Sequence, residues 1–166
     1  MDDIKKISDK AVEIAVSQLG QKEEPIGSNS GPVVDEYLKS VGLEPGYAWC
    51  QAFVYWCYAQ AATALGVPNP VVHTVGVLDC WNRTAVNIKI HSSEAQGKPS
   101  LINVGDQIIF KHSNGTGHTG IVEKVIGQDI HTIEGNTNNN GSREGYEVER
   151  KVRTLDDVRL LGFISY

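Results

Sequence analysis

Three stretches of the first 66 residues repeat apolar positions at the spacing of a helix. The first, residues 7–19, predicts an amphipathic helix with Ser8 as its N-cap. The second predicts a helix over residues 32–41, where a proline fits the first turn. The third predicts a helix over residues 50–65, which Gly66 ends.

Beyond residue 100 the pattern changes to short apolar runs bounded by turn-forming residues, which is typical of strands. The predicted strands are 107–110, 118–126, 129–136, 146–152 and 158–164. Residues 81–90 allow one more strand, whereas 92–100 and 138–145 are predicted to be loops. Helices followed by a meander of strands predict an α+β fold. In it, N-terminal helices pack on a mostly antiparallel sheet of five to six strands.

The totals narrow the class of protein. A length of 166 residues predicts one domain over residues 1–166, and a net charge of −5 argues against nucleic-acid binding. No apolar run is long enough to insert into a membrane, and no apolar signal-peptide core follows the first residues. We therefore expect a monomer that is made in the cytoplasm without a signal peptide. The cysteines are three in number and show no Cys-x-x-Cys pair, so no metal or other cofactor is expected.

The third predicted helix begins at Cys50, and this position has chemical consequences. Unpaired backbone N–H groups and the positive end of the helix dipole favour an anion there. A thiol at a helix start is therefore biased toward the nucleophilic thiolate. The alternative is a core position, because cysteine is among the most buried residue types. Cys57 and Cys80 are interpreted as core residues.

A thiolate that attacks an acyl carbon needs a base, a group that orients the base, and donors for the oxyanion. His118 is the candidate base, because it starts a strand between small residues. Glu134 and Asn136 are the candidate orienting groups, since their spacing of two residues puts them on one face of the next strand. Either could accept a hydrogen bond from the imidazole, and the backbone N–H of Cys50 could serve the oxyanion. In the alternative interpretation, Glu134 is a surface charge and Asn136 only opens a turn.

Four blocks of the sequence together resemble the CHAP family of cysteine, histidine-dependent amidohydrolases/peptidases. They are Tyr-Ala-Trp-Cys-Gln-Ala-Phe (47–53), Val-Gly-Asp-Gln-Ile-Ile-Phe (104–110), Gly-His-Thr-Gly-Ile-Val (117–122) and Ile-Glu-Gly-Asn (133–136). The resemblance covers roughly residues 10–165 and implies a papain-like fold. It implies that Cys50 is the nucleophile and that His118 is the general base and then the acid. It also implies that Glu134 and Asn136 orient or polarise the site.

The resemblance further implies a substrate, the peptidoglycan of the bacterial cell wall. The residues leave open whether the enzyme is an N-acetylmuramoyl-L-alanine amidase or an endopeptidase. Residues 29–32 and Trp49 resemble the phage-lysin-like branch of the family, the endolysins. Tyr47, Trp49 and Asn29 are the candidate substrate-binding residues, although packing and turn formation explain them equally well. Residues 21–49 lack the alternating aspartates of a calcium loop, so calcium is not expected.

Two alternatives to a wall hydrolase remain open. One is a non-catalytic wall-binding module of the same fold, against which the intact cysteine, histidine and glutamate argue. The other is a cytosolic cysteine hydrolase, such as a deamidase toxin, which would explain the absence of a signal peptide. A wall hydrolase without a signal peptide would need a holin-like or injection route to reach the cell wall or periplasm.

Overall fold

The computed structural model describes residues 2–137 and 145–166. Its helices are α1 (Asp2–Ser17), α2 (Pro32–Ser40), α3 (Cys50–Leu65), α4 (Val77–Arg83) and α5 (Ser92–Gly97), with short 3-10 helices η1 (Val86–Ile88) and η2 (Pro99–Leu101). Its strands are β1 (Lys89–His91), β2 (Gln107–Lys111), β3 (Gly117–Ile126), β4 (Asp129–Thr137), β5 (Glu147–Thr154) and β6 (Leu160–Ile164). No helix in this part of the chain is long and apolar enough to cross a membrane.

The strands form a six-stranded sheet in the order β1-β6-β2-β3-β4-β5, in which every neighbouring pair is antiparallel. Consecutive strands from β2 to β5 are neighbours, as expected of a meander. This arrangement confirms the predicted α+β fold with N-terminal helices and an antiparallel sheet.

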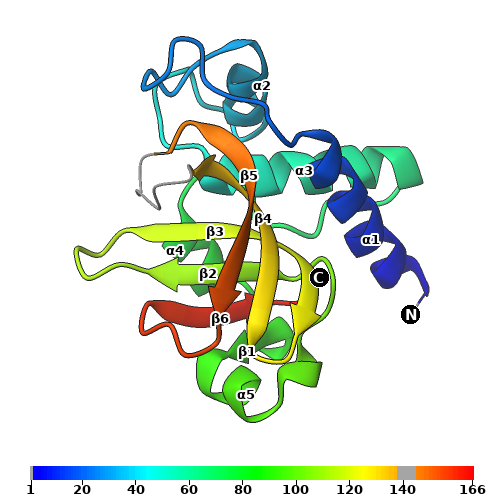
Figure 1. The fold of residues 1–166 in the computed structure, drawn as a ribbon. Coiled ribbons are helices and arrows are strands. Elements are labelled where there is room, and N and C mark those ends of the chain that lie inside the picture. The colour runs from blue at the N-terminus through cyan, green and yellow to red at the C-terminus, as the bar shows by residue number, and fades with distance from the viewer. Residues whose placement is uncertain (1, 138–144) are drawn as a thin grey trace.

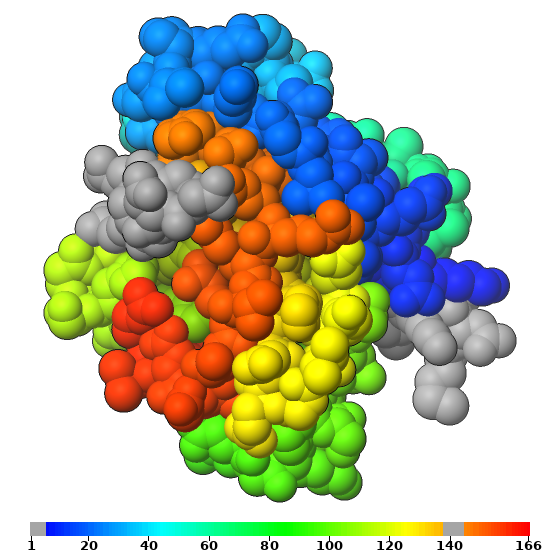
Figure 2. All heavy atoms as spheres, in the orientation of Figure 1, coloured from blue at the N-terminus to red at the C-terminus, as the bar shows by residue number. Residues whose placement is uncertain are grey.

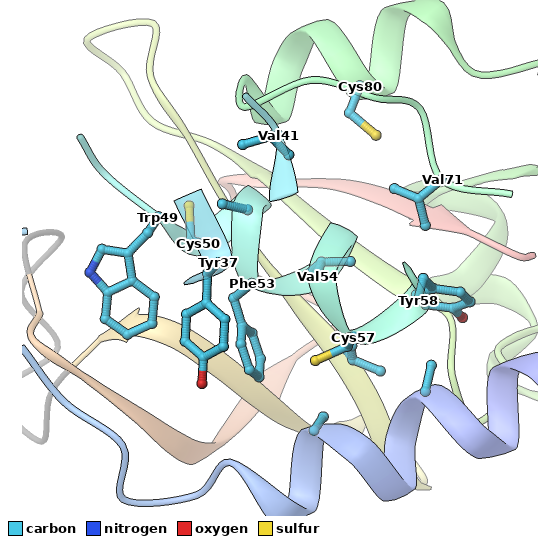
Figure 3. Close-up of a cluster of buried hydrophobic side chains, with 14 of the residues drawn as sticks. Tyr37, Val41, Trp49, Cys50, Phe53, Val54, Cys57, Tyr58, Val71 and Cys80 are labelled. Atoms are coloured by element: carbon cyan, nitrogen blue, oxygen red, sulfur yellow. The ribbon is translucent and has the colours of Figure 1, made fainter. Parts of the chain in front are cut away.

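Helices α1 and α3 pack together and cover one side of the sheet at β3 and β4 (Figure 1). The approach of α3 depends on Gly135 of β4, because a Cβ atom there would lie 2.7 Å from the Trp49 ring and 2.9 Å from Phe53. Both aromatic side chains are fully buried and stand beside the Tyr37 ring (Figure 3). The start of α3 is therefore fixed against the sheet by tight aromatic packing.

The opposite side of the sheet has its own apolar core. Alternate residues of the strands, such as Ile108, Val122 and Ile130, join Ala95 of α5 there. Since successive side chains of a strand point to opposite faces, neighbouring residues on β3 contribute to different cores.

The free edge of β5 is covered by the chain between α1 and α2. The backbone N–H of Gly20 donates to Val148, Val148 donates to Gln21, and Glu23 donates to Tyr146. The blue spheres of this segment lie against the orange spheres of β5 in Figure 2. Covering an edge strand in this way satisfies its unpaired backbone groups.

Several local predictions are wrong. Ser8 is not an N-cap, because α1 begins at Asp2 and the buried Ser8 hydroxyl donates to the Tyr166 carbonyl oxygen. Residues 92–100 are not a loop but contain α5, whose start is stabilised by a hydrogen bond from the His91 N–H to the Glu94 carboxylate. In residues 81–90, helix α4 continues to Arg83, and only the last two residues belong to strand β1. The loop predicted at 138–145 lies almost entirely outside the described residues.

Candidate active site

Cys50 is the first residue of α3, as predicted, with Trp49 as the N-cap residue. Its sulfur points away from the Trp49, Tyr37 and Phe53 rings, whereas Cys57 lies further along the helix in the core (Figure 3). Cys50 is 7% exposed, and Cys57 and Cys80 are 0% exposed. Of the three cysteines, the one at the helix start is therefore the one with some exposed surface.

His118 of β3 connects the cysteine to the sheet. Its Nε2 lies 2.6 Å from Oε1 of Glu134, and the Cys50 side chain lies close enough to the imidazole to raise its pKa. The imidazole also stacks on Phe110 of the neighbouring strand, with ring centroids 6.4 Å apart. Gly120 makes room for this arrangement, since a Cβ atom there would lie 2.5 Å from Cγ of Glu134. The thiol, imidazole and carboxylate thus converge from three separate elements.

The surroundings of His118 favour its charged form. Burial alone would lower its pKa, but the Glu134 carboxylate and the hydrogen bonds to Cys50 and Glu134 together raise that pKa to about 9. His118 is therefore an imidazolium at neutral pH. With Nε2 bound to Glu134, Nδ1 is the ring nitrogen left for the cysteine.

Glu134 is completely buried and ionised. Burial raises its pKa, yet the hydrogen bonds from Arg153 and the charge of His118 outweigh burial and hold the pKa well below its usual range. Arg153 of β5 binds both carboxylate oxygens, with Nε 2.8 Å from Oε2, and the Thr132 hydroxyl donates to Oε2. The guanidinium also lies over the Phe110 ring, 5.1 Å from its centroid. The carboxylate that orients the imidazole is itself oriented by a bidentate arginine.

Arg153 and Thr132 are site residues that the sequence did not predict. Thr132 precedes Glu134 by two residues on the same strand, so alternation alone could have identified it. Arg153 stands opposite Ile130 in the β4–β5 pairing, and its relation to Glu134 follows only from that register.

Of the two candidate partners of the imidazole, Glu134 is the one that makes the contact.

Asn136 departs from the predicted regular strand. The β4–β5 register shifts between Glu134 and Thr137, and Asn136 has a left-handed φ of 56°. Its side chain is 3% exposed, and among the described residues Oδ1 has no hydrogen-bond partner. The same-face expectation for Glu134 and Asn136 assumed an unbroken alternation, which the register shift removes. The catalytic role of Asn136 stays a prediction.

The three candidate substrate-binding residues have different surroundings. Tyr47 is 55% exposed. The Asn29 carbonyl accepts from the Gly46 N–H, which ties its loop to the turn before Cys50. Trp49 is completely buried, and its indole donates to the buried Glu23 carboxylate at 2.9 Å. The expectation that Trp49 lines a substrate groove is therefore corrected, because its side chain belongs to the core.

In residues 2–137 and 145–166 no three or more His, Cys, Asp or Glu side chains gather as a possible metal site.

A thiol at a helix start, an imidazolium beside it and a buried carboxylate behind the imidazolium define a hydrolase-type cysteine–histidine site. The family model of the CHAP domain matches residues 42–136, which is more than half of the chain. The chain therefore belongs to the CHAP family of amidohydrolases and peptidases, and the predicted resemblance is confirmed.

Two further comparisons add little to this assignment. The structure is similar to one described as "The crystal structure of Ly7917", with a TM-score of 0.48 and 16% sequence identity. The similarity covers 95% of this chain and 61% of that chain, so this chain spans less than two thirds of the longer one. A comparison with curated proteins found no match.

Proposed function

We propose that the protein cleaves an amide bond of the peptidoglycan stem peptide through a cysteine acyl-enzyme. One observation carries the proposal: a buried imidazole lies beside Cys50 on one side and is hydrogen-bonded to the ionised Glu134 on the other. Membership of the CHAP family supports the amide bond as the class of bond that is cleaved.

In the first half of the reaction, the Cys50 thiolate attacks the carbonyl carbon and forms a C–S bond. The oxyanion that develops lies at the start of α3, where the Cys50 N–H has no partner within the helix. The His118 imidazolium then gives its proton to the amine nitrogen as the C–N bond breaks. The products are the free amine and a thioester on Cys50.

In the second half, the neutral His118 takes a proton from water. The resulting hydroxide attacks the thioester carbon, and the carboxylic acid leaves as Cys50 regains its thiolate and His118 keeps the proton. Glu134 stays ionised throughout. Its role is to hold the ring in one orientation and to stabilise the imidazolium.

The proposal leaves two bonds as candidates, the amide between sugar and peptide and a bond within the stem peptide. Acting on either bond requires access to the cell wall, and a holin-like or injection route is the one that we propose. Tyr47 and the Asn29 loop stand near the start of α3 and are the proposed contacts for the stem peptide.

The test is hydrolysis of purified peptidoglycan, with mass analysis of the released fragments. Wild-type protein is expected to release soluble fragments with new amine termini, whose masses identify the bond. Cys50→Ala is expected to release none. Cys57→Ala is the matched control, because it removes a thiol of the same helix that lies in the core. Equal release by wild type and Cys50→Ala would refute the acyl-enzyme.

A further inference from the structure

A second buried polar cluster lies on the other face of the sheet from His118 and Glu134. It consists of Gln51, Gln107, Thr119 and Tyr166, and we call it the neutral cluster. Gln51, Gln107 and Thr119 are 0% exposed, and Tyr166 is 8% exposed. None of its members takes part in the proposed chemistry, so its presence under the site needs an explanation.

Gln107 stands at the centre of the neutral cluster. Its Nε2 donates to Oε1 of Gln51 at 2.7 Å and to the Thr119 hydroxyl at 2.9 Å. Its Oε1 accepts from the Tyr166 hydroxyl at 2.7 Å. Both amide hydrogens and the carbonyl oxygen are thus used.

The orientation of the Gln107 amide is determined by its partners. The Thr119 hydroxyl donates its hydrogen to the Ile108 carbonyl oxygen at 2.7 Å, so toward Gln107 it can only accept. The NH2 group of Gln107 must therefore face Thr119. The amide oxygen then faces the Tyr166 hydroxyl.

The partners of Gln107 are the chain neighbours of the reacting residues. Gln51 follows Cys50 on α3, and Thr119 follows His118 on β3. Two consecutive helix residues are thus linked to two consecutive strand residues. Cys50 lies beside His118, and Gln51 is joined to Thr119 through the Gln107 amide. The amide of Gln107 joins the second pair and so fixes how the helix start sits against the strand.

Stability alone does not account for a glutamine here. Gln107 pairs with Ile121 on one side and Ile164 on the other, in the middle of the sheet, where an apolar residue is the ordinary choice. Burying an amide gains little net stability even when all its hydrogen bonds are made. A buried hydrogen-bond network instead selects one arrangement of the elements it joins. Here the central Gln107 amide uses all its groups, whereas Nε2 of Gln51 has no hydrogen-bond partner among the described residues.

We propose that Gln107 is a positioning residue that sets the distance and direction between the Cys50 thiol and the His118 imidazole. The inference rests on the proposed function, because it assigns Gln107 to the same site. A displacement of about 1 Å in such a site can cost roughly a hundredfold in rate.

The test is the rate of Cys50 alkylation by iodoacetamide between pH 5 and 10, read at each cysteine by peptide mass spectrometry. In Gln107→Met the rate at pH 7 is expected to fall roughly tenfold or more, with a shifted pH profile. Peptidoglycan hydrolysis should lose a similar factor in kcat and little in KM. Gln51→Met and Thr119→Val each remove one acceptor of the Gln107 NH2 group. If Gln107→Met does not fold, these two variants are expected to show the same fall in alkylation rate.

The control is Tyr58→Phe, which removes a buried hydroxyl that donates to the Gly105 carbonyl oxygen at 2.6 Å. It should lower stability and leave the alkylation profile unchanged. Profiles of Gln107→Met, Gln51→Met and Thr119→Val that coincide with wild type would overturn the inference. A different outcome separates the inference from the proposed function. If Cys50 is alkylated selectively and in a Gln107-dependent way, but the protein does not cleave peptidoglycan, the inference is upheld and peptidoglycan is refuted as the substrate.

Discussion

Two buried polar clusters flank the start of α3, and they differ in charge. His118, Glu134 and Arg153 form a charged cluster on one face of the sheet, in which an ionised carboxylate lies between two cations. The neutral cluster on the other face uses amides and hydroxyls, with the Cys80 thiol 3.8 Å from Gln107 Oε1. Both are largely buried and held by hydrogen bonds, yet only the first can set a protonation state.

The comparison separates two requirements of a cysteine–histidine site. Protonation of the imidazole needs a nearby anion in a poorly solvated place, which the charged cluster supplies. Positioning needs directional bonds that do not titrate, which the neutral cluster supplies. Substitutions in the two clusters should therefore cause losses of stability and hydrolysis that differ in size and in their dependence on pH.

The largest loss of stability is expected from Arg153→Leu. It leaves Glu134 buried with fewer partners, and breaking a buried ion pair in this way costs about 3 kcal/mol of unfolding free energy. Hydrolysis should fall as well, because the imidazole loses its fixed partner. Chemical denaturation and peptidoglycan hydrolysis measure the two effects.

Arg150→Leu is the control for Arg153→Leu. Arg150 also lies on β5 and also binds a glutamate through two nitrogens, but its side chain is 58% exposed. An exposed pair contributes less than about 1 kcal/mol. Equal losses in the two variants would show that the burial of Glu134 has no energetic consequence.

The charged cluster could be predicted from the sequence only in part. Cys50, His118 and Glu134 each lie in a short block with its own signal: a helix start, small residues before a strand, and alternation. Arg153 gave no such signal, because its contact depends on the register between β4 and β5. The irregular backbone at Asn136 could not be predicted, because a register shift after Glu134 cannot be recognised from alternation.

The neutral cluster could not be predicted at all. Gln107 lies in a run that reads as an ordinary strand, and Tyr166 is 59 residues away from it in the chain. Similar reasons explain the errors in the fold. The three long helices and five of the strands follow from periodicity, whereas α4 and α5 are too short to show a period.

The pH dependence should follow the charged cluster. The His118 pKa is raised to about 9, above the usual value of about 6.5 for histidine. The stabilisation by this group is therefore fully present below pH 6.5 and is lost as the pH rises through about 9. Hydrolysis should lose about tenfold per pH unit above 9, since the imidazolium that protonates the amine disappears.

Two measurements check the expected pH dependence. Denaturation from pH 6 to 10 should show that the advantage of wild type over His118→Gln shrinks toward high pH. The kcat/KM of wild type over the same range should bend near pH 9. A stability difference that stays constant across this range would contradict the raised pKa.

The smallest effect is expected from Tyr166→Phe in the neutral cluster. The substitution removes the hydroxyl that donates to Gln107 Oε1 and leaves that buried oxygen without a strong donor. The expected loss is about 1 to 2 kcal/mol of unfolding free energy. Burial raises the pKa of Tyr166 well above its ordinary value, so the hydroxyl is neutral throughout the working range. The loss should therefore be equal at pH 6 and pH 9, and a loss that varied between these two pH values would mean that the two clusters are electrostatically coupled through the sheet.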